Sequence, residues 1–421
     1  MASPALWLYR ALVTLAVPLA LPWALLSARL RGKHRPPLAA RLGRRLPPLP
    51  RGGVWVQAVS VGEVAVATPL LAELRRRHPD LPLVLSATTA TGLAVATGQQ
   101  SADVVLPFPL DLPGPVRRCL DAATPRLVIL VETELWPELL DGCRRRGIPV
   151  ALVNARISDS SFRGYRAARR LVRPLLTPVT LALAQEEQDA IRLVELGVPA
   201  ERVAVTGNIK FDSPPPATRP ALADEVERLA AGRPVLVAAS TMPGEEEVVL
   251  AAWSTLPVAS RPFLLLAPRH PERAAIALEL LSGHDIAAVR RTRLGESPRP
   301  CDALVLDTVG ELAALYSVAA IALVGGSLVP TGGHNPIEPA RFAVPVLTGP
   351  HVRNFSAVYR RFTEAGAVRV VHDAGELGAA LAEWLAEPDR ARAAGRAGQA
   401  LLAANTGATA RVADALERFL A

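Results

Sequence analysis

After Arg51, short runs of aliphatic and β-branched residues alternate with longer amphipathic stretches. The run Val54–Val59 predicts a strand, and the stretch from Val64 to His78 predicts the helix that follows it. Further strands are expected at Leu83–Ala87, Val104–Pro107, Leu127–Val131, Val150–Val153 and Leu181–Ala184. Because each run is short, apolar and separated from the next by a helical pattern, this half of the chain predicts a parallel sheet covered by helices on both faces.

A proline-rich segment, Phe211–Pro220, interrupts the pattern, and a second series of elements begins after it. Its expected strands are Val235–Ala239, Phe263–Ala267, Ile286–Val289, Ala303–Leu306, Ile321–Val324 and Val344–Leu347, and helical sequence runs from about Ala374 to Leu420. The fold class is therefore α/β, with two doubly wound domains in tandem and a cleft where the carboxyl ends of both sheets meet. The predicted domains are residues 51–211 and 212–421, preceded by an N-terminal segment of residues 1–50.

The N-terminal segment contains a long uncharged stretch, Ala11–Ala28, bracketed by Arg10 and Arg29. Eighteen helical residues rise ~27 Å, close to the ~30 Å hydrocarbon core of a bilayer. A single membrane-anchor helix, a helix lying in the interface and a cleaved signal peptide all fit this stretch. Since most of the positive charge follows the apolar run, we favour an anchor with the bulk of the chain in the cytoplasm.

The chain's formal charge of +8 is concentrated in the same segment. Met1–Arg51 holds nine basic residues and no acidic one, which leaves 38 basic and 39 acidic residues elsewhere. A nearly neutral body argues against a nucleic-acid partner, although the total charge alone would favour one. We expect the basic run from Arg29 to Arg51 to lie on anionic lipid headgroups.

Cysteine and lysine are both scarce. The three cysteines, Cys119, Cys143 and Cys301, have no paired spacing, which argues against a disulfide framework and a cysteine-based zinc site. Only two of the 47 basic residues are lysines, Lys33 and Lys210. Lys210 directly precedes the proline-rich segment, where it can reach an anionic substrate in the cleft or serve as an ordinary surface charge.

Two motifs of the first half carry carboxylates just after predicted strands. Ser60-Val61-Gly62-Glu63 opens the first helix, so Glu63 is a candidate general base or an ordinary first-turn acid that complements the helix dipole. Glu132 and Glu134 follow the strand Leu127–Val131, at the edge where doubly wound folds carry chemistry. The same run also reads as a helix start, with Thr133 as its cap and Pro137 in the first turn.

Motifs in the second half suit a nucleotide. Arg269, in Pro268-Arg269-His270, can offer two parallel hydrogen bonds to a phosphate, whereas His270 is expected to be structural. Thr308 and Glu311 have capping-box spacing, although the backbone beside Gly310 could read a nucleobase edge.

The strongest motif is the glycine-rich stretch that starts at Val324 and runs through Gly325-Gly326-Ser327 to Gly332-Gly333-His334-Asn335-Pro336-Ile337-Glu338. It predicts a strand, a loop whose backbone N–H groups suit a phosphate, and a helix with Asn335 as its cap and Pro336 at its first position. Glu338 could close a capping box or bind a ribose. No Gly-Lys-Ser/Thr follows, so the motif is not a Walker loop.

Taken together, these motifs resemble one family along the whole chain. The runs are VSVGEV, SATTATG, ETELWP, VNARIS, TGNIKFD, STMPGEEE, APRHPER, DTVGEL and VGGSLVPTGGHNPIEPA, in that order. Their set is similar to the 3-deoxy-D-manno-oct-2-ulosonic acid (Kdo) transferases that modify lipid A. One departure is visible, because Ser240-Thr241-Met242 stands where members commonly have Ser-Thr-His, and this puts a polar role at that position in doubt.

The resemblance implies a GT-B glycosyltransferase of two Rossmann-like domains that transfers Kdo from CMP-Kdo to a lipid A precursor, lipid IVA, in lipopolysaccharide biosynthesis. It implies inversion, no catalytic metal or other cofactor, and a location at the cytoplasmic face of the inner membrane. By resemblance, Glu63 matches the general base, and Glu132 and Lys210 match positions that support the transition state. The positions that match CMP contacts are Pro268, Arg269, Val309, Gly310, Glu311, Asn335, Pro336, Ile337 and Glu338.

Two other functions remain open at this point. A related GT-B protein, such as a nucleotide-sugar epimerase or a transferase that uses a UDP-sugar, would share the nucleotide-binding motifs. A membrane-tethered nucleotide-binding module without catalysis is the second. The combination of Glu63, Glu132 and Lys210 in one half with nucleotide motifs in the other argues against the module.

Overall fold

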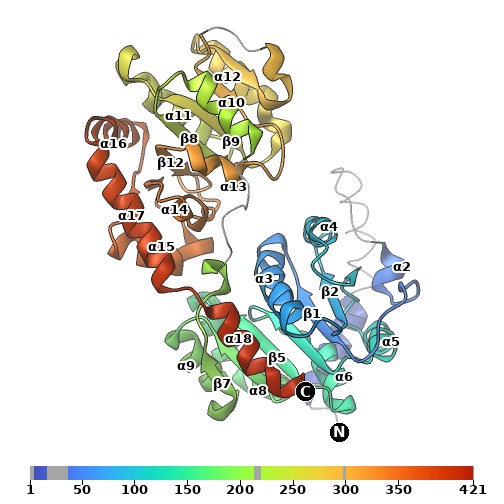
Figure 1. The fold of residues 1–421 in the computed structure, drawn as a ribbon. Helices are drawn as coiled ribbons and strands as arrows, with labels where there is room; N and C mark the ends of the chain where they lie inside the picture. The colour runs from blue at the N-terminus through green and yellow to red at the C-terminus, as the bar shows by residue number, and fades with distance from the viewer. Residues whose placement is uncertain (1–3, 17–36, 213–219, 297–299, 421) are drawn as a thin grey trace. The chain divides into compact units, whose positions relative to one another are not determined.

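The computed structural model describes residues 4–16, 37–212, 220–296 and 300–420, which belong to two compact α/β units (Figure 1). Unit 1 comprises Met1–Ser213 and Asn405–Ala421, and unit 2 comprises Pro214–Ala404. Each unit contains a seven-stranded sheet whose strand pairs are all parallel. The predicted pair of Rossmann-like parallel-sheet domains is thereby confirmed.

The sheet of unit 1 has the strand order β3-β2-β1-β4-β5-β6-β7. Its strands are β1 (Val54–Ala58), β2 (Leu83–Ala87), β3 (Val104–Pro107), β4 (Leu127–Val131), β5 (Val150–Ala155), β6 (Val179–Ala184) and β7 (Val203–Val205). Every residue of β1, β2, β4 and β5 is buried. Continuous burial explains why these strands read as apolar runs rather than as an alternating pattern.

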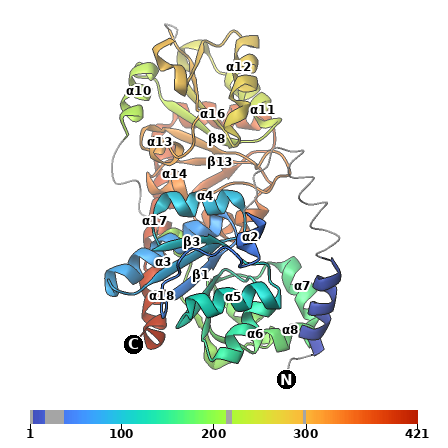
Figure 2. The same cartoon turned by 90° about the vertical axis from the view of Figure 1, so that its right-hand side faces the viewer.

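Helices cover both faces of this sheet. They are α2 (Leu38–Arg41), α3 (Val61–Arg77), α4 (Ala90–Gln99), α5 (Pro113–Ala123), α6 (Pro137–Arg146), α7 (Asp159–Ala167), α8 (Arg169–Leu176), α9 (Glu187–Leu196) and α18 (Ala408–Leu416). Figure 2 shows α3 and α18 on one face and α5 and α6 on the other. Two separate apolar cores result, one for each face.

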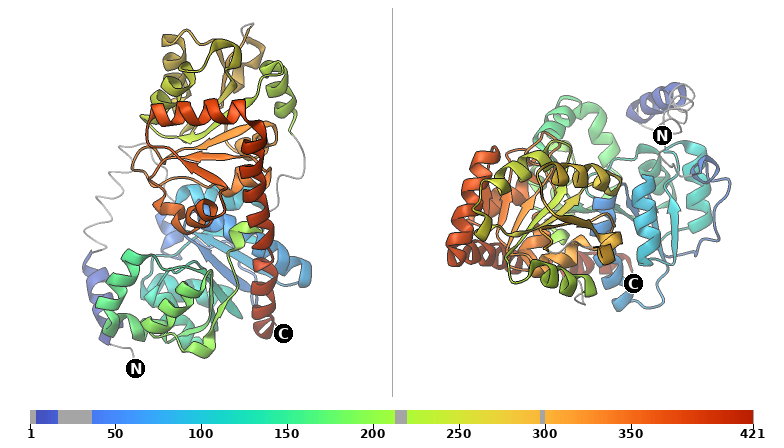
Figure 3. Two further views of the ribbon diagram at one scale, coloured as in Figure 1. Left: turned by 90° about the vertical axis from the view of Figure 1, so that its left-hand side faces the viewer. Right: turned by 90° about the horizontal axis from the view of Figure 1, so that it is seen from above.

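Unit 2 repeats the architecture with the strand order β10-β11-β9-β8-β12-β13-β14. The strands are β8 (Val235–Thr241), β9 (Phe263–Pro268), β10 (Ala288–Arg290), β11 (Ala303–Val305), β12 (Ile321–Val324), β13 (Val346–Thr348) and β14 (Val368–Val370). The helices are α10 (Ala221–Ala230), α11 (Glu245–Ser254), α12 (Ala274–Gly283), α13 (Leu312–Leu315), α14 (Ile337–Arg341), α15 (Ser356–Glu364), α16 (Ala374–Ala386) and α17 (Pro388–Ala404). Within this unit α16 packs on α11 and α17 on α14 (Figure 3).

Two strands, β7 and β14, were not predicted from the sequence pattern. Both β7 and β14 have only three residues, lie at a sheet edge and keep part of their surface in solvent. Such short, half-exposed strands lack the continuous apolar run that marks the central ones. The last helix is a further difference, because α18 was expected to close the second domain. Its residues Val412, Ala413 and Leu416 are instead buried in a core of unit 1, where they pack with α3.

The N-terminal helix, residues 4–16, is held to the rest of unit 1 by polar contacts. The guanidinium of Arg10 donates to Glu138 and Asp141, and the hydroxyl of Tyr9 donates to Asp111 at 2.8 Å. Within the described ranges, no helix combines the length and apolarity needed to cross a bilayer. Residues 17–36, which carry most of the predicted anchor, lie outside those ranges, so the anchor stays a prediction.

Candidate active site

The carboxyl edge of the unit 1 sheet gathers the candidate catalytic residues of the first half. β1 lies between β2 and β4, so the order of the strands reverses between β1 and β4. Ligands of doubly wound folds bind at such a switch point. Glu63 lies in the first turn of the helix after β1, and Glu132 directly follows β4, so the two acids flank this point.

Glu63 is a buried carboxylate with two hydrogen bonds. The Val59 N–H donates to Oε2 at 2.7 Å and the Ser60 hydroxyl donates to Oε1 at 3.0 Å, while only 7% of the residue is exposed. Burial raises the pKa of Glu63 to about 7, with the negative charges of Glu132 and Glu134 adding to the rise and the two hydrogen bonds opposing it. A carboxylate with a pKa near 7 can take a proton at neutral pH, which is what a general base requires.

Glu132 and Lys210 form an ion pair beside Glu63. The Lys210 ammonium lies 2.7 Å from Glu132 Oε1, and the side chains keep 19% and 26% of their surface exposed. The backbone of Glu132 is left-handed, with φ of 60°, a conformation that costs about 1–3 kcal/mol and often occurs at functional sites. The structure therefore brings all three predicted catalytic residues of unit 1 to one edge, although their roles stay predictions.

The helix start predicted after β4, with Thr133 as its cap, is wrong. α6 begins at Pro137 with Trp136 as its N-cap, so Thr133 does not cap it. The Thr133 hydroxyl instead accepts a hydrogen bond from the Arg156 N–H at 3.0 Å. Glu134 is partly buried, and burial followed by the charge of Glu132 raises its pKa. The turn after β4 thus joins the loop after β5 instead of running directly into a helix.

In unit 2, the predicted CMP contacts around Arg269 and Gly310 lie at the carboxyl ends of the neighbouring strands β9 and β11. Pro268 is the last residue of β9, and the exposed Arg269 holds its place through a backbone hydrogen bond to Thr241 at 2.9 Å. Val309 is exposed, and Gly310 has a φ of 94°, which glycine adopts readily. Glu311 is paired with Arg291 at 3.0 Å.

The predicted capping box at Thr308 and Glu311 is wrong. The Thr308 hydroxyl donates to the Glu311 carboxylate, and α13 begins only at Leu312, with Glu311 as its N-cap. A capping box would need the Glu311 N–H to donate to Thr308. The side chain of Glu311 therefore bridges Thr308 and Arg291.

The asparagine motif starts α14 one residue later than predicted. The helix begins at Ile337 with Pro336 at the N-cap, and the Asn335 side chain accepts a hydrogen bond from the Ile337 N–H at 3.1 Å. Asn335 also donates to Glu338 Oε1 at 3.3 Å. Burial raises the pKa of Glu338, while Asn335, Arg341 and Arg269 oppose that rise. One Glu338 oxygen is thus occupied inside the motif.

The glycine-rich loop after β12 does not offer its first N–H groups to a ligand, which corrects the phosphate prediction for that part of the loop only. Glu245, at the start of α11, is fully buried and accepts hydrogen bonds from the N–H groups of Gly326, Ser327 and Leu328 at 2.6–2.9 Å. It also accepts from the Met242 N–H at 2.9 Å. An internal carboxylate therefore fills the position expected for an anion, and Met242 contributes its backbone to that arrangement.

His334 is a further polar residue of this motif for which the sequence suggested no role. Its pKa falls to about 4 because it is buried and lies near the positive charges of Arg269 and His270. The imidazole is therefore neutral at pH 7 and can serve as a hydrogen-bonding group beside Arg269. Its place between the glycines and Asn335 was the available signal.

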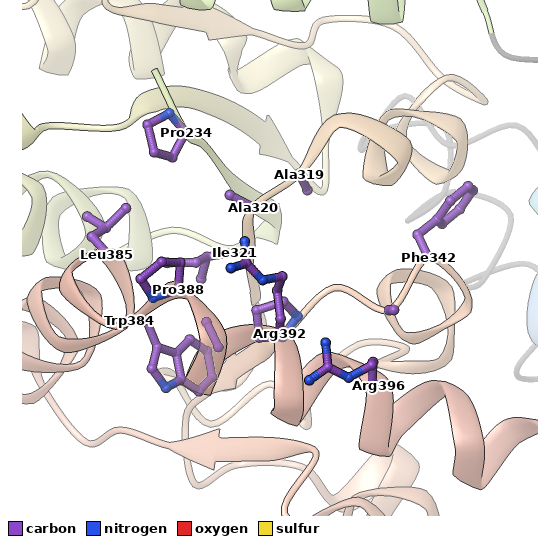
Figure 4. Close-up of a pocket in the computed structure, with 13 residues that line it drawn as sticks. Pro234, Ala319, Ala320, Ile321, Phe342, Trp384, Leu385, Pro388, Arg392 and Arg396 are labelled. Atoms are coloured by element: carbon purple, nitrogen blue, oxygen red, sulfur yellow. The ribbon is translucent and has the colours of Figure 1, made fainter. Parts of the chain in front are cut away.

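The cavity drawn in Figure 4 lies elsewhere in unit 2. It has a volume of about 420 Å³ and is lined by Pro234, Ile321 and Pro345 at the amino ends of β8, β12 and β13. Trp384 and Arg396 line it from α16 and α17. None of the predicted site residues lines it, and it lies at the sheet edge opposite to theirs. Over the described ranges, no group of three His, Cys, Asp or Glu side chains is arranged to hold a metal ion.

Comparisons with known proteins agree with the motifs. The family model described as 3-deoxy-D-manno-octulosonic-acid transferase (kdotransferase) matches residues 24–213. A 3-deoxy-D-manno-octulosonic acid transferase from Haemophilus influenzae is 35% identical over 98% of both chains. One from Bordetella pertussis is 38% identical, covering 98% of this chain and 99% of its own.

A solved structure supports the fold alone. UDP-GlcNAc 2-epimerase from Neisseria meningitidis, bound to UDP-GlcNAc, aligns with a TM-score of 0.60 at 14% identity over 87% of this chain and 100% of that chain. Such low identity says nothing about activity. The two relatives that are 35% and 38% identical over nearly the whole length do support a family assignment. The chain therefore belongs to the 3-deoxy-D-manno-octulosonic acid transferase family of glycosyltransferases.

Proposed function

We propose that this chain transfers Kdo from CMP-Kdo to lipid IVA, a lipid A precursor, with inversion at the anomeric carbon, in lipopolysaccharide biosynthesis. The observation that carries the proposal is the buried Glu63, with a pKa of about 7, beside the Glu132–Lys210 ion pair in a chain of this family. A buried base next to a cation suits the activation of a sugar hydroxyl near an anionic donor.

In the proposed reaction, Glu63 accepts the proton of a glucosamine hydroxyl on the acceptor. The hydroxyl oxygen forms a bond to the anomeric carbon of Kdo as the bond from that carbon to the CMP phosphate oxygen breaks. CMP leaves as an anion, so no general acid is required. Lys210 is positioned in unit 1 to stabilise negative charge, and Arg269 offers two parallel hydrogen bonds to phosphate in unit 2.

We propose that unit 2 binds CMP through the edge that carries Arg269, Gly310 and Asn335. The exposed guanidinium, the neutral His334 and the backbone near Gly310 supply donors for phosphate and base. No metal ion is needed in this proposal, because the leaving group is already charged and the cations are side chains. Transfer should therefore persist in excess EDTA, and a dependence on added Mg²⁺ would count against this part.

We also propose that the N-terminal segment holds the enzyme on anionic lipid at the cytoplasmic face of the inner membrane. Support comes from the apolar side chains Trp7, Leu8, Leu12 and Leu15, all exposed on a helix that Arg10 ties to unit 1. Leu12→Glu/Leu15→Glu should weaken binding to phosphatidylglycerol vesicles and leave CMP affinity unchanged. Equal losses of both would contradict this division.

The proposed function is tested by incubating the purified full chain with CMP-Kdo and lipid IVA and by weighing the lipid product by mass spectrometry. A mass gain of one or more Kdo units is expected. Calorimetry with CMP and UDP separates the related enzymes, since preference for UDP would favour a UDP-sugar transferase or an epimerase. CMP binding without any transfer would favour a nucleotide-binding module.

A further inference from the structure

The carboxyl end of β5 contains a bulge next to the edge of unit 1 that carries the proposed catalytic residues. β5 pairs with β6 through Leu152 opposite Ala182 and Ala155 opposite Ala184, so two residues of β5 face one of β6. Asn154 occupies this bulge with a φ of 56°, and it is completely buried. Bulges of this kind turn a side chain away from its regular direction and are common beside active sites.

The bulge contacts the chain segments on both sides of the Glu132–Lys210 ion pair. On one side, the carbonyl of Val153 accepts a hydrogen bond from the Glu132 N–H at 2.8 Å. On the other side, the Asn154 side-chain oxygen accepts one from the Ile209 N–H at 2.9 Å. Two consecutive residues of β5 therefore hold the backbone at Glu132 and the backbone next to Lys210.

The turn that carries Lys210 is held by backbone N–H groups that donate to asparagine side chains. It is the 3-10 turn η2 (Ile209–Phe211), whose Lys210 N–H donates to the Asn208 side chain at 3.0 Å. The bond from Asn154 joins the backbone of this turn to the sheet, whereas the bond to Asn208 stays within the segment that carries the turn. Ile209 is fully buried, so the turn has little freedom once its N–H is bound.

Packing alone does not account for asparagine at position 154. Its side-chain nitrogen is buried and has no hydrogen-bond partner among the described residues, which is unfavourable for a polar group. Left-handed backbone is also uncommon for residues other than glycine, although asparagine tolerates it better than most. The residue combines the backbone shape of the bulge with an acceptor aimed at the Lys210 turn.

We infer that Asn154 is a positioning residue that holds the Lys210 ammonium opposite Glu132. It does so without touching substrate, through the Ile209 N–H on one side and through Val153 on the other. This inference rests on the proposed role of Lys210 in stabilising the transferred group. Loss of the bond should move the ammonium by a fraction of its present 2.7 Å separation from Glu132, and a displacement of about 1 Å can cost ~10²-fold in rate.

The test compares Asn154→Gly and Asn154→Asp in the full chain. Glycine adopts the left-handed backbone but removes the acceptor, so kcat should fall ~10–10²-fold with KM for CMP-Kdo nearly unchanged. Aspartate keeps an oxygen that can accept from Ile209, so it should recover part of the lost kcat. Ser86→Ala is the matched control, because Ser86 is equally buried and hydrogen-bonded in unit 1 but lies on β2.

A double-mutant cycle with Lys210→Ala separates positioning from loss of stability. If Asn154 acts through Lys210, Asn154→Gly should have little further effect on kcat in the Lys210→Ala background. The inference would be overturned if Asn154→Gly lowered kcat by the same factor in the parent and in Lys210→Ala. It would also be overturned if Ser86→Ala lost as much kcat at a matched fall in Tm. Full activity of Lys210→Ala would overturn the proposed role of Lys210, whereas a strong Lys210→Ala defect with an unaffected Asn154→Gly overturns the inference alone.

Discussion

Each unit contains a buried glutamate in a corresponding position, and the two carboxylates differ in the number and kind of hydrogen-bond donors around them. Glu63 lies in the first turn of the helix after β1, and Glu245 lies in the first turn of the helix after β8. Each of these strands is the first of its sheet in chain order, lies near the centre of the sheet and borders the point where the strand order reverses. Glu63 receives one backbone N–H and one hydroxyl, whereas Glu245 receives four backbone N–H groups.

The number of hydrogen-bond donors distinguishes the proposed base, Glu63, from the structural carboxylate, Glu245. Hydrogen bonds to the charged form stabilise it, and burial and like charges oppose it. Burial, reinforced by two acidic neighbours and opposed by only two donors, raises the pKa of Glu63 to about 7, so it can accept a proton. Three of the four N–H groups around Glu245 belong to the loop after β12, so its oxygens hold that loop in place. The same architecture thus carries the proposed base in unit 1 and a carboxylate that holds a loop in unit 2.

The largest effect should come from Glu63→Gln, which keeps the shape of the side chain but cannot accept the proton as a carboxylate does. We expect kcat to fall ~10²–10⁴-fold while CMP affinity, measured by calorimetry, stays at the parent level. Glu73→Gln is the control, because Glu73 lies on the same helix and, among the described residues, forms ion pairs with Arg76 and Arg77. Transfer by Glu63→Gln within a few-fold of the parent would remove Glu63 as the base.

Glu245→Ala tests the other half of the comparison. It leaves buried backbone N–H groups without an acceptor, which should cost about 3 kcal/mol or more and lower the Tm of unit 2 by about 6–12 °C. CMP binding should weaken with it. The exposed Glu247→Ala in the same helical turn serves as the control and should melt like the parent. Unchanged melting of Glu245→Ala would show that the loop does not need the carboxylate.

Arg269→Ala should act on donor binding and leave the base chemistry intact. Loss of the guanidinium should raise KM for CMP-Kdo about tenfold or more, with a smaller change in kcat, because two charge-assisted hydrogen bonds are lost. Arg269→Lys keeps the charge without the planar fork and should fall between the parent and Arg269→Ala. A fall in kcat with KM unchanged would instead place Arg269 in the chemical step.

The smallest effect should follow from Glu134→Gln. Its charge contributes to the raised pKa of Glu63, so removing it should move the acidic limb of the kcat/KM profile toward lower pH. Activity at pH 8 should change little, since Glu63 is ionised there in both proteins. A shift toward higher pH would contradict the electrostatic account of Glu63.

The sequence predicts the sheets better than it predicts the contacts between loops. Central strands such as β4 and β12 follow directly from their apolar runs, and their bounds agree with the structure. The acids after β1 and β4 were also expected at one edge, because parallel strands end there together. The bulge at Asn154 and the bonds to Glu245 join segments 55 and more than 80 residues apart. A first-turn acid looks the same in the sequence whether four N–H groups or two donors surround it.

The most direct test of the central claim is the pH dependence of kcat/KM for the parent and Glu63→Gln side by side. A carboxylate that must be ionised gives a rate that rises through its pKa, so the parent should show an acidic limb near pH 7. In folding, the same raised pKa favours the native state below about pH 4.5, and that contribution is lost as pH rises through about 7. We predict that the limb near pH 7 is absent from the residual activity of Glu63→Gln, and the same limb in both proteins would contradict the assignment of Glu63 as the base.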